Sequence, residues 1–133
     1  MNEGTKERLK KLNKLLINSL ESNLSIRVFQ DSVSEDEFKH ELNGIYHYII
    51  FETGGMRKAD DSKFTLIQDV LVRFYAENVD DVDNAQIDVI SILENKGYTF
   101  MNSTKSAIQK GKEDAYVDEI EFNFTRSFKY VCC

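Results

Sequence analysis

The chain has 133 residues, of which 41% are hydrophobic and 30% charged, with a formal net charge of −6. This length predicts a single domain over residues 1–133, large enough to bury a core without disulfides or metals. No apolar run approaches the roughly 20 residues of a membrane helix, and no cleavable secretory signal follows the basic N-terminus. The acidic balance argues against wrapping nucleic acid, because that affinity comes mainly from neutralising phosphates.

The first part of the chain predicts an amphipathic helix over residues 5–23, with Thr5 as its cap. Four leucines at helical spacing form its apolar stripe: Leu9, Leu12, Leu16 and Leu20. The first half of this helix is basic, and no role for that charge follows from the sequence. Residues 24–29 predict a short strand. Ser34 and Glu37 then have the spacing of a capping box at the start of a short helix.

The hydrophobic period changes to that of strands in the middle of the chain. Residues 44–52 are rich in aromatic and β-branched side chains and predict a strand. Residues 53–62 predict a connection whose Gly54 and Gly55 suit a turn. Residues 64–76 predict a long strand with apolar side chains on both faces, which is typical of a central position in a sheet.

A second helix is predicted over residues 79–96. Asn78 is the expected cap, nearby aspartates favour the positive N-terminal end, and Gly97 suits a left-handed C-terminal cap. Residues 98–109 then predict a strand, residues 110–115 a turn, and residues 116–130 a final strand. The order α-(β)-β-β-α-β-β predicts an α+β fold: an antiparallel sheet with an N-terminal helix and a second helix packed on one face.

Candidate reactive sites fail on inspection. The acidic stretch DDVDNAQID fails as a calcium loop, because Ala85, Gln86 and Ile92 stand where ligands or glycine are needed. GGMRK lacks the spacing of a phosphate loop. His40 and His47 are the only histidines, and no serine or cysteine has a recognisable nucleophile context. Cys132 and Cys133 are interpreted as two free thiols. We therefore expect no enzymatic activity, no cofactor and no metal.

The second helix carries two isoleucines outside its predicted buried stripe. Ile87 lies close to the acidic face that includes Asp80 and Asp88, and Ile90 also lies off the stripe. Isolated apolar residues are common on protein surfaces. The alternative is a contact between subunits, and we take Ile87, Ile90, Asp80 and Asp88 as candidate interface residues.

The final strand raises two further questions. Its inward register contains Ile120, Phe122, Phe124 and Phe128, and Arg126 falls among them. An unpaired buried arginine would be very costly. Three arrangements avoid the cost: the head reaches water past the edge of the core, it pairs with a carboxylate of its own chain, or it reaches an acid of the next subunit. The third makes Arg126 a candidate interface residue.

The length of this strand favours a partner as well. At about 3.3 Å per residue it spans roughly 50 Å, whereas a compact domain of this size is about 35 Å across. Either the strand bends or breaks, or part of it projects and pairs with a neighbour.

With the elements in order, the chain resembles the tail terminator and head-to-tail joining proteins of tailed bacteriophages, often labelled minor capsid or tail completion proteins. The segments that carry the resemblance are YHYIIFETGG with FTLIQDVLVRFYAEN, then DDVDNAQIDVISILENKG, then EIEFNFTRSFKY. The basic first helix and the terminal cysteines have no counterpart that we can match in this family.

The resemblance implies a non-enzymatic structural protein of the virion, assembled in the host cytoplasm. It would form a ring, commonly a hexamer, that caps the tail tube and joins it to the head connector. Its partners would be copies of itself, the tail tube protein and the head connector protein. DNA would pass through the ring without specific binding, and no membrane would be involved. Two alternatives are another phage neck or head-completion protein and a small cytosolic protein-interaction adaptor.

Overall fold

The computed structural model describes residues 3–42, 45–77, 81–109 and 116–130. The elements in chain order are α1 (Glu3–Leu24), β1 (Arg27–Gln30), α2 (Glu35–His40), β2 (His47–Ala59), β3 (Ser62–Glu77), α3 (Val82–Asn95), β4 (Thr99–Gln109) and β5 (Tyr116–Lys129). The α+β class predicted from the sequence is confirmed. The predicted turn at 110–115, the cap predicted at Asn78, the candidate interface residue Asp80 and both cysteines lie outside the described residues.

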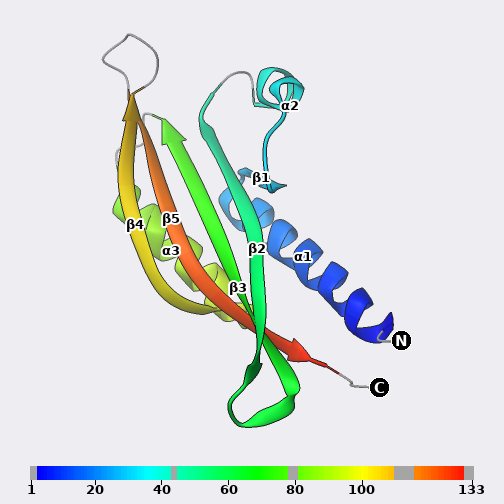
Figure 1. Cartoon of the computed structure of the whole chain (residues 1–133). Helices are drawn as coiled ribbons and strands as arrows, with labels where there is room; N and C mark the ends of the chain where they lie inside the picture. The colour runs from blue at the N-terminus through cyan, green and yellow to red at the C-terminus, as the bar shows by residue number, and fades with distance from the viewer. Residues whose placement is uncertain (1–2, 43–44, 78–80, 110–115, 131–133) are drawn as a thin grey trace.

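The five strands form one sheet in the order β1-β2-β3-β5-β4 (Figure 1). β2, β3, β5 and β4 pair antiparallel, and β3 is central, as its apolar faces predicted. The sheet is nevertheless mixed, because β1 pairs parallel to β2. The connection from β1 through the short helix α2 lets β2 run in the same direction as β1. The short apolar run that predicted β1 contained no information on strand direction.

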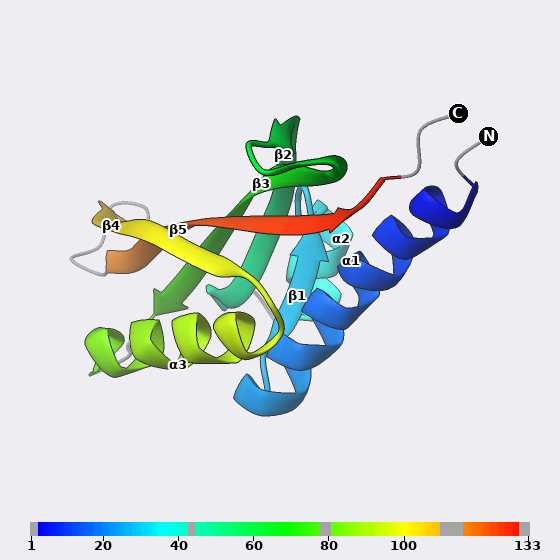
Figure 2. The same cartoon turned by 90° about the horizontal axis from the view of Figure 1, so that it is seen from below.

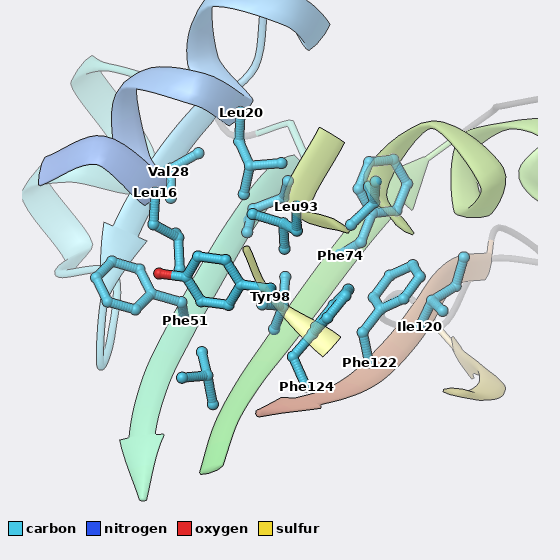
Figure 3. Close-up of a cluster of buried hydrophobic side chains, with 14 of the residues drawn as sticks. Leu16, Leu20, Val28, Phe51, Phe74, Leu93, Tyr98, Ile120, Phe122 and Phe124 are labelled. Carbon is cyan, nitrogen blue, oxygen red and sulfur yellow. The ribbon is translucent and has the colours of Figure 1, made fainter. Parts of the chain in front are cut away.

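The two long helices lie on the same face of the sheet and meet toward their C-terminal ends (Figure 2). Alternate residues of the central strands face them and form the main core, which Figure 3 shows from Leu16 and Leu20 of α1 to Leu93 of α3. Phe51, Phe122, Ile49, Leu16, Leu20 and Leu93 are completely buried. The amphipathic pattern of both helices therefore positions them as predicted.

A smaller aromatic cluster covers one end of the opposite face. Phe38 of α2 packs against Tyr46 and Tyr48, with ring centroids 4.8 Å and 6.3 Å away. α2 begins at a complete capping box: the Ser34 hydroxyl accepts from the Glu37 N–H, and the Glu37 carboxylate accepts from the Ser34 N–H. The rest of this face carries no helix in the described part of the chain.

Several predicted boundaries were wrong. α1 begins at Glu3, so Thr5 lies inside the helix rather than capping it. The N-cap of α3 is Asp81, whose side chain accepts from the Asn84 N–H. The largest difference is at residues 53–62, where the predicted loop is mostly strand and the turn between β2 and β3 is formed by Asp60 and Asp61. Gly54 and Gly55 lie at a β-bulge between Thr53 and Met56 instead, since glycine suits a bulge as well as a turn.

The final strand is unbroken over its 14 residues. Both of its neighbours belong to the same chain: β4 on one side, and on the other β3, which it follows from Thr65↔Lys129 to Glu77↔Val117. The strand fits because the whole sheet is long and curved (Figure 1). Its length therefore needs no second subunit.

Candidate assembly surfaces

The outer face of α3 is the first surface. Ile87 is 60% exposed, and Asp88 beside it is exposed too. Ile90 differs from the prediction: it is half-buried and packs against the main core. Asp80 lies outside the described residues. The structure thus places Ile87 and Asp88 together on the surface, whereas Ile90 lies closer to the interior than predicted.

Arg126 does not lie on any surface, being only 4% exposed. Its Nε and Nη2 donate to Oε1 of Gln68, at 3.0 Å and 2.8 Å, and its Nη1 donates to the Tyr98 hydroxyl at 3.2 Å. The first arrangement predicted from the sequence is therefore wrong, because the head is not in water. No carboxylate among the described residues pairs with it, and such deep burial does not favour a contact with the next subunit.

Neutral hydrogen bonds compensate part of the cost of burying this charge. Gln68 and Arg126 are direct cross-strand partners, and Gln68 Nε2 donates onward to the Gly54 carbonyl at 3.1 Å. Burial raises the pKa of Tyr98, and the adjacent guanidinium of Arg126 opposes that rise. The polar chain thus runs from the start of β4 to the bulge of β2 through the centre of the sheet.

The sequence reasoning missed Gln68 and Tyr98. Gln68 lies in the same register of β3 as Val70, Val72 and Phe74, so a polar residue inside an apolar register was the available signal. Two such residues on separate strands, Gln68 and Arg126, could have been paired on that basis.

The second surface is formed by strand edges. β4 ends the sheet on one side, and on the other side β1 pairs only with Tyr48–Phe51 of β2. Beyond Phe51, no strand in the described residues pairs with the outer edge of β2. The β2–β3 hairpin therefore projects past β1 and β4 (Figure 1), with Met56 and Phe64 about half exposed. Such edges have unpaired backbone donors and acceptors.

The uncovered face of the sheet is polar around Arg73 of β3. Its Nη1 donates to Glu52 at 2.7 Å and its Nε to Glu121 at 3.3 Å, so one cation bridges carboxylates of the two neighbouring strands. A shallow hollow of about 310 Å³ next to it is lined by residues that include Glu52, Gly54, Met101 and Asn123. The two carboxylates of this lining are in ion pairs, Glu52 with Arg73 and Asp69 with Arg57 at 3.1 Å.

The third surface is the first half of α1, where basic residues are exposed. Arg8 also lines a hollow of about 280 Å³ with Thr65, Ser127, Phe128 and Lys129. This hollow has two cations and two hydroxyls, which suits a carboxylate or another anion.

Within the described residues, no group of histidine, cysteine, aspartate or glutamate side chains has the arrangement of a metal site. None of the described helices has the length and apolar character needed to cross a membrane. No family model matches the chain, and no curated protein matches it either.

Proposed function

We propose that this chain is a structural, non-enzymatic subunit of the head–tail junction of a tailed bacteriophage. In this proposal copies of the chain form a ring that caps the tail tube and contacts the head connector protein. The order and pattern of the elements resemble those of tail terminator proteins. This resemblance is the reason for proposing that class of protein, and the exposed surfaces of the fold support an assembly role.

One observation carries the proposal: the sheet has two open edges on opposite sides, with a projecting hairpin on one of them. A contact that joins two different surfaces of identical chains is heterologous, and it closes into a ring when the rotation between copies divides a full turn. β2 and β4 run in opposite directions in the sheet. A copy rotated about an axis along the strands therefore presents its β2 antiparallel to β4.

The electrostatics fit a passage for DNA. The net charge is −6, and DNA is repelled by an acidic ring rather than held by it. On the uncovered face of the sheet, Glu52 and Glu121 lie on either side of Arg73, so the acids outnumber the base in this group.

The test is deletion of the gene in the phage that carries it, with the wild-type chain supplied from a plasmid as the control. We expect filled heads and tails that are absent, detached or of irregular length, counted by electron microscopy, and infectivity restored by the plasmid. Normal infectious particles from the deletion would rule the proposal out. A quick first check is gene order, because portal and tail tube genes on either side are expected.

A further inference from the structure

α1 and α3 contact each other on the helical face of the sheet, yet their first halves point away from one another (Figure 2). The buried residues of α1 are Leu16, Ser19 and Leu20, all in its second half. Those of α3 are Val89 and Leu93, also in its second half. The two first halves therefore lie on opposite flanks of the molecule.

The flank formed by α1 is basic with an apolar end. Arg8, Lys11 and Leu15 are three and four residues apart, so they share one face of the helix. Leu15 is 40% exposed, and Arg8 and Lys11 are exposed. Lys6 and Lys10 are paired with glutamates of the same helix, at 3.7 Å and 4.0 Å. Arg8 and Lys11 have no such ion pair within the described residues.

The flank formed by α3 is complementary. Asn84, Ile87, Asp88 and Ser91 follow helical spacing and make one exposed face. Ile87 is the exposed apolar residue of this face. Asp83 at its margin is bound by Lys105 at 3.1 Å, whereas Asp88 has no ion pair with any described residue.

We propose that the α1 face Arg8–Lys11–Leu15 of one copy binds the α3 face Asn84–Ile87–Asp88–Ser91 of the next copy. Leu15 packs on Ile87, and the cations of α1 meet Asp88. The occupant is a second copy because the two flanks are complementary: each has one exposed apolar residue, and their charges are opposite in sign. This inference rests on the proposed ring and identifies its subunit contact.

The same contact gives the basic half of α1 a role. One chain cannot bring its own two flanks together, because the second halves of the helices are fixed on the sheet. The contact is therefore heterologous, and each copy has one flank of each kind, as a ring requires. Charge complementarity of this sort fixes which surfaces meet.

The first experiment is a charge swap, measured as complementation of the gene deletion. Lys11→Glu and Asp88→Lys are each expected to lower the titre by at least about tenfold, and the double variant to recover most of it. The matched controls are Lys39→Glu, Asp36→Lys and their double on α2, which lies on the other face of the sheet; these should complement like wild type. The melting temperature of each purified variant separates loss of contact from loss of folding.

The second experiment tests by disulfide cross-linking whether residues 15 and 87 of neighbouring copies are in contact. Leu15→Cys and Ile87→Cys are combined in a chain with Cys132→Ser and Cys133→Ser, and concentrated protein and assembled particles are oxidised. We expect a ladder of cross-linked oligomers from the double-cysteine chain, and no product larger than a dimer from either single-cysteine chain. Absence of the ladder in assembled particles would overturn the contact.

Other outcomes are equally decisive. If the single charge variants complement fully, or the double stays defective while folded, the contact is wrong even though the ring proposal stands. If the wild type binds duplex DNA and Lys11→Glu abolishes that binding without affecting oligomers, the basic flank is a phosphate surface instead. If the deletion itself has no effect, the proposed function is wrong, and absence of the cross-linked ladder from concentrated protein then overturns the contact as well.

Discussion

Arg126 has a buried guanidinium whose hydrogen-bond partners in the described chain are uncharged. Such a group loses its hydration on folding and gains only the hydrogen bonds to Gln68 and Tyr98 in return. Those bonds join β5 to β3 and to the start of β4, and Gln68 extends the connection to the bulge of β2. We therefore interpret Arg126 as a residue that fixes how the strands align.

The first prediction concerns its removal. Arg126→Met keeps most of the volume but leaves Gln68 Oε1 and the Tyr98 hydroxyl unpaired in the core, so the free energy of unfolding should fall by about 1–3 kcal/mol. Arg126→Met with Gln68→Leu removes one of those orphaned acceptors and should be less destabilised than the sum of the single changes. Urea unfolding measures both, with exposed Ser127→Ala as the control near zero. Strict additivity would contradict the coupling.

The second prediction concerns alkaline pH. Burial raises the pKa of Tyr98, so the folded state keeps this proton where the unfolded state has released it. The stability linked to Tyr98 is fully present below about pH 10 and is lost as the pH rises from there through the folded pKa. Tyr98→Phe should lower the free energy of unfolding at pH 7, because the variant loses the hydrogen bond from Arg126. Between pH 9 and 11, however, the stability of the variant should fall less than that of the wild type. An unchanged alkaline slope would refute this.

At the scale of the elements, a single residue at the end of a helix can set the path of the chain that follows. α3 ends at Asn95, and Gly97 follows with φ +93°, a conformation that side chains with a Cβ rarely adopt. Its N–H donates to the Glu94 carbonyl at 3.1 Å, and the next residue, Tyr98, then enters the core. The turn at Gly97 thus sets the position of a partner of Arg126.

The third prediction follows from this turn. Gly97→Ala should lower the free energy of unfolding by about 1 kcal/mol through strain at positive φ, although a Cβ there would meet no atom within 4 Å. Gly4→Ala is the matched control: it also has open space but lies within α1, so it should stabilise by up to about 1 kcal/mol. Thermal unfolding compares the two, and equal signs would contradict the conformational explanation.

For the molecule as a whole, one face and two edges remain accessible once the chain has folded. The two long helices cover one face completely enough to bury the core, and α2 covers only an end of the other. The curved sheet lets β5 stay paired over its full length while the β2–β3 hairpin projects (Figure 1). The ring proposed above uses what the fold leaves uncovered.

The sequence by itself determined the elements and most of their faces. Periodicity depends on local geometry, so the α1 leucines, the two-sided β3 and the left-handed Gly97 were predictable, as were the Ser34–Glu37 capping box and the α+β class. Ile87 was correctly placed on the surface by the same reasoning.

Only the tertiary structure decided the long-range pairings. The parallel direction of β1, the bulge at Gly54 and the strand pairing beyond it depend on residues distant in sequence, as does the partnership of Arg126 with Gln68 and Tyr98. Local patterns indicate which residues turn inward but not which ones meet there. The core can hold a guanidinium because β3 and the end of α3 bring neutral acceptors to it, and their meeting is a property of the folded chain.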